Sequence, residues 1–300
     1  DYASRRVGDA PMSIRVENLS HIYNEGTPMA RVALRDVNLS IEDGEFIGLI
    51  GHTGSGKSTL IQHFNGLLAP TEGKVYVDGI DLSAKDTSLR AIRQKVGMVF
   101  QYPEHQLFGE TVYEDVAFGP RNAGVNEDEV AQRVKEALEW VGLDYEALKD
   151  HSPFELSGGQ KRRVAIAGVL AMRPGVLILD EPTAGLDPEG SAEILGKIQD
   201  LHKRRGITVI LVSHSMEDVA RLCSRLIVME HGGIVLDGTP KQVFSQIDRL
   251  REMGLGVPQV TEVMHELKRR GLPVQTDVLT LEEAEAELLR VLELRRHGTV

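Results

Sequence analysis

The stretch Gly51-His52-Thr53-Gly54-Ser55-Gly56-Lys57-Ser58 decides the fold of this chain, because it joins two segments of different periodicity. Before it, residues 46–50 are almost continuously apolar, which is typical of a buried parallel strand. After it, apolar residues recur at helical spacing: Leu60, Ile61, Phe64, Leu67 and Leu68. A strand, a glycine-rich turn and a helix in this order predict an α/β fold with a phosphate-binding loop.

The chemistry of the loop follows from its residue types. Glycines let backbone N–H groups turn inward around phosphate oxygens, and the helix that begins near Lys57 directs its positive end at the same anion. We expect Lys57 to reach the β- and γ-phosphates of ATP and Ser58 to offer its hydroxyl to Mg²⁺. The candidate nucleotide-binding residues here are Gly51, His52, Thr53, Gly54, Ser55, Gly56, Lys57, Ser58 and Thr59.

Composition narrows the possible partners and compartments. The 300 residues carry a net charge of −11, so a nucleic acid is a poor first candidate for a partner. One cysteine, Cys223, allows no intrachain disulfide and suits a reducing cytosol. No apolar run approaches the ~20 residues that a membrane helix needs, and residues 1–11 are a polar tail without signal-peptide features. If the protein works at a membrane, we expect it to dock onto another protein that spans the bilayer.

The rest of the chain divides by pattern. Residues 13–20, with a slip before Leu19, and 32–41 alternate like half-buried antiparallel strands. Further strands are expected at 75–77, 96–100, 176–179 and 208–212, with a crossover helix at 188–205. A late hairpin, 226–229 and 234–236, turns around Gly232-Gly233. We therefore expect a tail (1–11), an ATPase domain (12–244) with an inserted helical subdomain (about 102–172), and a C-terminal helical domain (245–300).

Two helices of the last region can be placed by their own signals. Pro258 opens the first, with Val260, Val263, Met264 and Leu267 predicted on one face. Residues 280–283, Thr-Leu-Glu-Glu, form a predicted capping box that opens the second. Its expected apolar stripe consists of Leu281, Ala284, Leu288 and Val291.

Polar side chains follow three of the predicted buried strands. Asp180 and Glu181 come directly after residues 176–179, at the edge of the sheet where open α/β folds bind ligands. Asp180 can hold Mg²⁺, and Glu181 can orient and deprotonate an attacking water. Gln101 can bind Mg²⁺ or water, and His214 can contact a γ-phosphate. The alternative for each is a structural role as a polar residue at a strand end.

Two further segments suggest nucleotide contacts. Ser157-Gly158-Gly159-Gln160 precedes a helix, so it forms either a second anion-binding helix end or a plain helix cap. One lysine loop and two anion-binding ends per chain favour a head-to-tail pair, in which each ATP lies between the loop of one subunit and this segment of the other. Tyr23 can stack on adenine or serve as a partly buried aromatic residue.

These segments, in this order over residues 13–244, resemble the ABC ATPase family. Tyr23 matches the A-loop, 51–58 Walker A, Gln101 the Q-loop, 156–160 the signature, 176–181 Walker B, 184–187 with Asp187 the D-loop, and His214 the switch histidine. The resemblance implies an α/β P-loop NTPase of ABC type with an antiparallel β subdomain, an inserted helical subdomain and a C-terminal helical appendage. It also implies an ATPase with ATP and Mg²⁺ as ligands.

A narrower resemblance lies in three stretches: residues 99–108 (Val-Phe-Gln-Tyr-Pro-Glu-His-Gln-Leu-Phe), 116–120 and 162–172. They are similar to ATP-binding subunits of energy-coupling factor (ECF) vitamin transporters, in the A-prime type that pairs with a sister ATPase. The resemblance implies a peripheral protein at the cytoplasmic face of the cell membrane. Its implied partners are a second ATPase subunit, an integral membrane coupling subunit and a substrate-binding membrane subunit.

The same resemblance places the contact with the membrane subunit at Gln101 to Phe108, with Glu104 and His105 reaching polar or basic groups. Cobalt and nickel importer ATPases are close alternatives. ABC ATPases of DNA repair are less suitable because residues 51–181 leave no room for a coiled-coil insertion. Translation ATPases have two ATPase domains in one chain, and exporter ATPases lack a tail of the 245–300 type.

Overall fold

The structure, a computed structural model, describes residues 12–296, so the expected tail at residues 1–11 lies outside it. The chain forms two compact units. The first contains residues up to Glu45 and from Ser58 to Ile210, and the second contains Phe46–Lys57 and residues from Leu211 onward. None of the described helices combines the length and apolarity that a membrane crossing requires.

The first unit carries most of the predicted ATPase domain. Its elements are β1 (Met12–Tyr23), β2 (Arg31–Glu42), α1 (Lys57–Phe64), β4 (Glu72–Val77), β5 (Ile80–Asp81), α2 (Leu89–Lys95), β6 (Val96–Val99), η1 (Pro103–Gln106), α3 (Val112–Asn122), α4 (Glu127–Trp140), α5 (Tyr145–Leu148), η2 (Pro153–Glu155), α6 (Gly158–Leu170), β7 (Val176–Asp180), α7 (Pro188–Arg205) and β8 (Thr208–Val212). The boundary between the units falls at the first residue of α1 and within β8.

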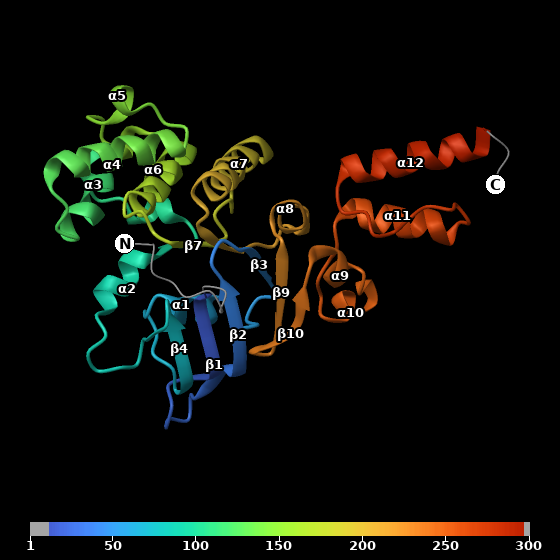
Figure 1. The fold of residues 1–300 in the computed structure, drawn as a ribbon, viewed down its shortest axis with the longest axis horizontal. Coiled ribbons are helices and arrows are strands. Elements are labelled where there is room, and N and C mark those ends of the chain that lie inside the picture. Colours follow the sequence, from blue (N-terminus) through green and yellow to red (C-terminus); the bar gives the residue numbers. More distant parts are fainter. Residues whose placement is uncertain (1–11, 297–300) are drawn as a thin grey trace, which may run out of the picture. The chain divides into compact units, whose positions relative to one another are not determined.

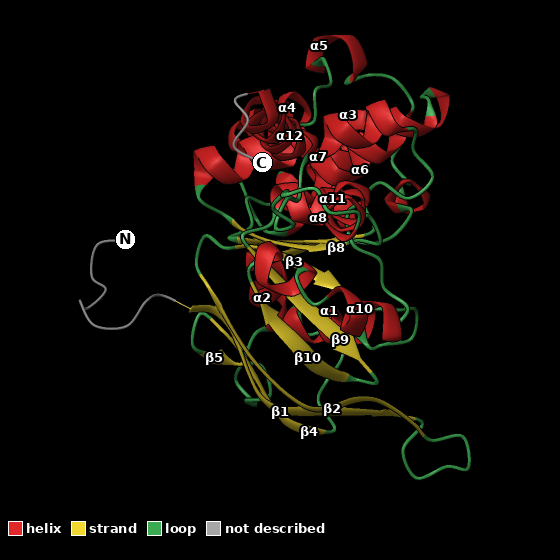
Figure 2. Ribbon diagram, turned by 90° about the vertical axis from the view of Figure 1, so that its right-hand side faces the viewer, coloured by secondary structure: helices red, strands yellow, loops and turns green. Residues whose placement is uncertain are grey.

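An antiparallel sheet in the order β2-β1-β4-β5 forms one part of this unit (Figure 2). The alternating residues Ile14 and Val16 are fully buried, as the period of two predicts. The slip before Leu19 is a register shift in the β1–β2 pairing between Val16 and Leu19, and Leu19 is buried as a result. The sheet extends to β5, a two-residue strand too short to show periodicity.

The strands β8, β7 and β6 lie in that order, with β6 and β7 pairing in parallel. Between β6 and β7 the described chain is helical, from η1 to α6. Side-chain caps begin most of these helices, because Thr111, Asn126, Asp144 and Ser157 each accept a backbone N–H of the first turn. Helices α3, α4 and α6 pack together, as Figure 1 shows.

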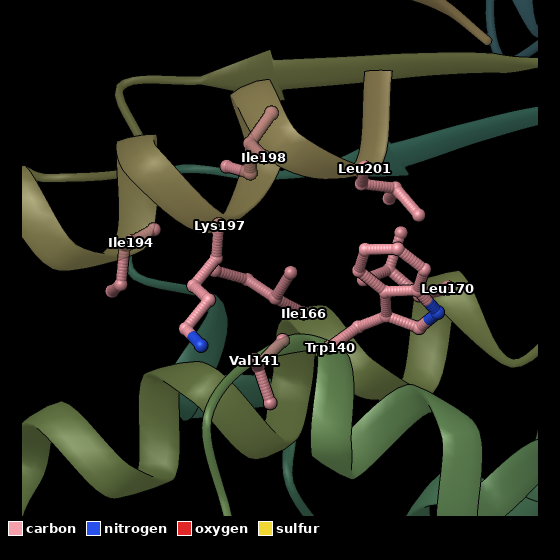
Figure 3. A pocket seen from close by; sticks show the side chains of 8 residues that line it. All are labelled: Trp140, Val141, Ile166, Leu170, Ile194, Lys197, Ile198 and Leu201. Carbon is pink, nitrogen blue, oxygen red and sulfur yellow. The ribbon is translucent and has the colours of Figure 1, made fainter. Parts of the chain in front are cut away.

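Apolar side chains of α4 and α7 pack against helix α6. A small cavity of about 10 Å³ lies where α4, α6 and α7 meet (Figure 3). Its lining consists of Trp140, Val141, Ile166, Leu170, Ile194, Lys197, Ile198 and Leu201. The guanidinium groups of Arg204 and Arg205 lie 5.7 and 5.4 Å from the Trp140 ring centroid, within the range of cation–π contacts. The α4–α6–α7 packing therefore fixes the helix whose first residues are the predicted Ser157–Gln160 segment.

The second unit contains β3 (Phe46–Ile50), α8 (Met216–Leu222), β9 (Arg225–Glu230), β10 (Gly233–Gly238), α9 (Pro240–Phe244), α10 (Ile247–Glu252), α11 (Gln259–Arg269) and α12 (Leu281–Arg296). All five residues of β3 are buried, and β3 pairs in parallel with β9. The predicted hairpin is present, since β9 and β10 pair antiparallel around His231 and Gly232. Their φ values of 50° and 82° suit the tight turn that strand twist favours.

Helices α11 and α12 lie side by side (Figure 1) and share a small core. Met264, Ala284 and Val291 are buried in it, and Val260, Leu267 and Leu288 pack against it. Two predictions for these faces are wrong, because Val263 is 53% exposed and Leu281 is 77% exposed. Leu281 is the first residue of α12, and neither it nor Val263 belongs to the core that the two helices share. One half of the predicted capping box is present, because Thr280 Oγ1 accepts the Glu283 N–H (3.2 Å). The other half differs, because the Glu283 carboxylate accepts the N–H of Leu279.

Candidate functional site

The predicted phosphate loop follows β3 directly and ends where α1 begins at Lys57. An ideal Cβ on Gly51 would lie 2.4 Å from the Met229 carbonyl oxygen and 2.6 Å from Ser55 Oγ. Only glycine therefore fits at position 51, where the loop backbone lies close to the Met229 carbonyl of β9 and to the Ser55 side chain. The Lys57 ammonium donates to the carbonyl oxygens of Gly51 (2.6 Å) and His52 (3.1 Å). The loop thus folds around its own lysine.

The interior of the loop fits an anion. Lys57 is 7% exposed, which places a positive charge in a nearly solvent-free position. Ser55 is fully buried, and its hydroxyl makes no hydrogen bond within residues 12–296. A buried hydroxyl without a partner is rare and calls for a ligand or water. A phosphate group would accept hydrogen bonds from both the Ser55 hydroxyl and the Lys57 ammonium, so the residues present suit the predicted nucleotide.

In the first unit, a hydrogen bond links α1 to Tyr23. The Tyr23 hydroxyl lies 3.1 Å from Thr59 Oγ1, and the Tyr23 side chain is 36% exposed. Behind it, His63 Nδ1 donates to the carbonyl of Thr59 (2.7 Å), and its Nε2 lies 3.2 Å from Nδ1 of His21. Burial lowers the pKa of His63, which favours the neutral ring. Tyr23 therefore has a hydroxyl held by Thr59 and a partly exposed side chain.

The predicted Mg²⁺ and water ligands share one edge of the first unit. Strands β6 and β7 are parallel, with Val99 opposite Leu179. Gln101 therefore lies just beyond the carboxyl end of β6, beside the strand that ends at Asp180 and is followed by Glu181. Gln101 is exposed. No group of three or more His, Cys, Asp or Glu gathers as a metal site within the described chain. Mg²⁺ characteristically binds one or two carboxylates together with phosphates and water, which suits this sparse donor set.

Ser157 and Gln160 form a complete capping box at the start of α6. The Ser157 hydroxyl accepts the Gln160 N–H (3.2 Å), and the Gln160 side-chain oxygen accepts the Ser157 N–H (3.1 Å). A Cβ added to Gly158 or Gly159 would meet nothing within 4 Å. Internal packing therefore does not require these two glycines. They leave the backbone at a helix N-terminus uncovered, which suits the approach of an external anion.

The remaining predicted residues stand at helix starts. Asp187 is the N-cap of α7, and its carboxylate accepts the Gly190 N–H (2.7 Å). His214 follows β8 in the second unit and is exposed, one residue before the Ser215 cap of α8. The predicted residues are thus divided: 51–57 and His214 belong to the second unit, and the others belong to the first.

Sequence reasoning missed one buried polar cluster. Arg162, which is 2% exposed, forms a bidentate ion pair with Glu104 (2.7 and 3.0 Å). Burial opposes ionisation of Glu104, but the hydrogen bonds and charge of Arg162 outweigh it, so the Glu104 pKa lies below its ordinary value. Within this chain the Glu104 carboxylate is therefore bound by Arg162, and its expected contact with a membrane partner stays a prediction. No local pattern could have revealed a pair separated by 58 positions.

Three comparisons place the chain among known proteins. A family model described as ABC transporter matches residues 34–184. The energy-coupling factor transporter ATP-binding protein EcfA2 of Caldanaerobacter subterraneus subsp. tengcongensis is 62% identical over 281 residues, which cover 94% of this chain and 98% of that protein.

Two solved structures share the fold. The structure of cbiO1 from Clostridium perfringens, described as part of the ABC transporter complex cbiONQ, is 41% identical with a TM-score of 0.72 and covers 86% of this chain and 99% of that one. A dimeric structure of the ATP-binding cassette MJ0796, in a post-hydrolysis state bound to ADP and Pi, is 33% identical with a TM-score of 0.68. It covers 76% of this chain and 98% of that chain.

Proposed function

This chain belongs to the ABC transporter family, among its energy-coupling factor ATP-binding proteins, and we propose that it hydrolyses ATP to power a membrane transporter that takes up vitamins or other micronutrients. The observation that carries the proposal is the phosphate loop with its nearly buried ammonium and its buried, unpaired Ser55 hydroxyl. The relative at 62% identity carries the energy-coupling factor name, so we rank this function above the cobalt or nickel importer alternative.

We propose the following roles in nucleotide binding. Lys57 and residues 51–56 hold the β- and γ-phosphates, since the loop presents a cation and a hydroxyl donor. Thr59 continues this contact at the start of α1. Tyr23 stacks on adenine, its ring oriented by the hydrogen bond to Thr59. Bound Mg²⁺ would neutralise charge on the phosphates, with Ser58, Gln101 and Asp180 as the residues that hold it.

Hydrolysis requires a base and a stabiliser of the γ-phosphate. We propose that the Glu181 carboxylate accepts the proton of the attacking water and that His214 hydrogen-bonds the γ-phosphate. Ser157, Gly158, Gly159 and Gln160 serve the ATP of a second ATPase subunit, because their glycines leave the helix end open. Asp187 caps α7 at the end of the segment that follows Glu181, and we propose that it contacts the paired subunit's site.

The site of contact with an integral membrane coupling subunit is proposed from exposed aromatic side chains. Phe108 and Phe118 are 61% and 48% exposed, and their rings meet edge to face with centroids 4.8 Å apart. An exposed aromatic pair suits a helix of a partner better than Glu104, whose carboxylate is held by Arg162. The chain would then act peripherally at the cytoplasmic face of the membrane, beside a separate subunit that binds the substrate.

The test of ATPase function is Glu181→Gln, which keeps the size of the side chain and removes the base. We expect hydrolysis to fall by at least about 10²-fold while ATP-dependent dimers still form, measured by phosphate release and size-exclusion chromatography. Glu193→Gln, on an exposed carboxylate of α7, is the matched control. Brisk hydrolysis by the Glu181 variant would overturn the assignment of the base.

Transport is tested separately from ATP hydrolysis. Phe108→Ala is expected to lower substrate uptake by reconstituted vesicles without changing ATP binding, because it removes half of the aromatic pair. Met29→Ala, which alters another exposed apolar side chain, serves as the control. Purification from membranes in detergent should recover the chain with integral membrane proteins, and its recovery alone would contradict the transporter assignment.

A further inference from the structure

Arg162 makes four hydrogen bonds from a buried guanidinium on α6. Nε and Nη2 donate to the two carboxylate oxygens of Glu104 at 3.0 and 2.7 Å. Nη1 donates to the carbonyl oxygens of Pro182 and Ala184 at 3.3 and 2.6 Å. The planar fork of arginine can satisfy two parallel carboxylate bonds and two carbonyls at once, whereas the single nitrogen of lysine cannot.

The two carbonyls belong to the loop that carries Glu181. Within this loop, the Glu181 carbonyl accepts the Ala184 N–H (3.2 Å), and the Thr183 carbonyl accepts the Leu186 N–H (3.1 Å). The carbonyls of residues 182 and 184, which alternate with these, are the ones that Arg162 binds. Two overlapping turns and one guanidinium therefore define the path of the backbone directly after Glu181.

The backbone at Glu181 needs such support. Its φ is 50°, in the left-handed region that favours glycine. A residue with a Cβ stays in that region only when its surroundings hold it there. The hydrogen bonds from Arg162 to the next residue and to Ala184 supply that restraint from a different helix.

Glu104 connects this arrangement to the segment after Gln101. It lies on η1, which begins after Tyr102, another residue with a left-handed φ of 55°. The Tyr102 ring also lies over the guanidinium, 5.8 Å from Arg162 Cζ. Arg162 therefore contacts both the segment after Gln101 and the loop after β7, and these hydrogen bonds link the two segments only through its side chain.

We propose that Arg162 is a positioning residue for hydrolysis: its guanidinium holds the 181–186 loop so that the Glu181 carboxylate faces the attacking water, and Glu104 holds the guanidinium. This inference rests on the proposed ATPase function and goes beyond it. Movement of η1, when a partner engages the segment after Gln101, would be passed through one side chain to the backbone that carries the base.

The neighbouring Arg163 offers a matched comparison. It also forms a bidentate ion pair, with Glu193 of α7, but the Glu193 side chain is 45% exposed. Within residues 12–296, Arg163 makes no hydrogen bond to a carbonyl of the 181–186 loop. Arg163→Lys and Glu193→Gln therefore change the same kinds of group, in an ion pair that joins α6 to α7 instead of η1, without touching the loop.

The experiment compares Arg162→Lys with Arg163→Lys in the full chain, with Mg²⁺ and ATP as substrate. We expect kcat to fall about tenfold for Arg162→Lys with KM for ATP unchanged within about twofold, and Arg163→Lys to resemble the unaltered chain. Thermal melting of each variant with ATP bound separates this effect from loss of the fold. An Arg162→Lys variant with the kcat of Arg163→Lys would overturn the inference.

Glu104→Gln supplies an independent variant that leaves Arg162 in place. We expect a smaller fall in kcat, and the double variant Glu104→Gln/Arg162→Lys should be no slower than Arg162→Lys alone, because the two residues act in series. Additive losses would contradict the connection through Glu104. If the unaltered chain does not hydrolyse ATP, the proposed function itself fails, whereas normal hydrolysis in all variants refutes only the role of Arg162.

Discussion

Replacing Gly158 or Gly159 by alanine should change stability and activity in opposite directions. Both residues lie in the first turn of α6, and a Cβ at either position meets nothing within 4 Å. Neither has a positive φ that would strain alanine. A methyl group therefore fits the chain itself without any clash. It would project from the open helix end, where we propose that the phosphates of a second subunit's ATP lie.

The magnitude follows from these two facts. Alanine restricts the unfolded backbone more than glycine, so each substitution should raise the free energy of unfolding by about 0.5 kcal/mol. For a chain of this size that corresponds to an increase in Tm of about 1–2 °C. The same methyl would hold the anion away from the backbone donors of the helix end. Loss of one such donor costs about 10²-fold in kcat in comparable oxyanion sites.

The assay pairs thermal unfolding without nucleotide with phosphate release at saturating ATP. Gly51→Ala is the contrasting control, because its Cβ would approach the Met229 carbonyl to 2.4 Å and should lower both stability and activity. Full hydrolysis by Gly158→Ala and Gly159→Ala would refute the proposed contact with a second nucleotide. A lowered Tm would show instead that these glycines serve the fold of the chain.

Three further predictions concern buried groups. Burial lowers the pKa of His63 below 6.5, so the unfolded chain binds this proton at a higher pH than the folded chain does. The free energy of unfolding should therefore decline below pH 6.5, by at most about 1.4 kcal/mol per pH unit. His63→Asn should remove this part of the pH dependence, as measured by urea titrations at several pH values. Thr208→Val should cost about 1–3 kcal/mol in urea unfolding, because the buried hydroxyl accepts the Gly44 N–H at 2.9 Å, and Thr208→Ser should restore most of it. Burial raises the pKa of the Cys223 thiol, so iodoacetamide at pH 8 should modify it only after unfolding, as mass spectrometry can show.

The sequence could predict what depends on local pattern. Residues 46–58 carry both the strand periodicity and the loop chemistry, so β3, the loop and the start of α1 follow from one stretch. The register shift before Leu19 was visible as a break in alternation. The site residues could be named for the same reason, since they lie at or beside the ends of strands and the starts of helices.

What the sequence could not predict depends on which partner a face meets. Val263 and Leu281 continue an apolar stripe along their helices, yet the α11–α12 packing covers only the neighbouring positions. Periodicity fixes the direction of a stripe but not its width.

Glu104 illustrates the same limit at a functional residue. Its sequence neighbours favoured a role at the surface, and its partner comes from a helix 58 positions further along the chain. The pairing buries two charges, which is tolerated only when both are paired and hydrogen-bonded, so each residue has a fixed geometry. Because the same guanidinium also binds the carbonyls after Glu181, a pair that looks structural becomes a restraint on the proposed base. This arrangement makes a testable prediction: a partner that displaces η1 should change the rate of ATP hydrolysis more than it changes the affinity for ATP.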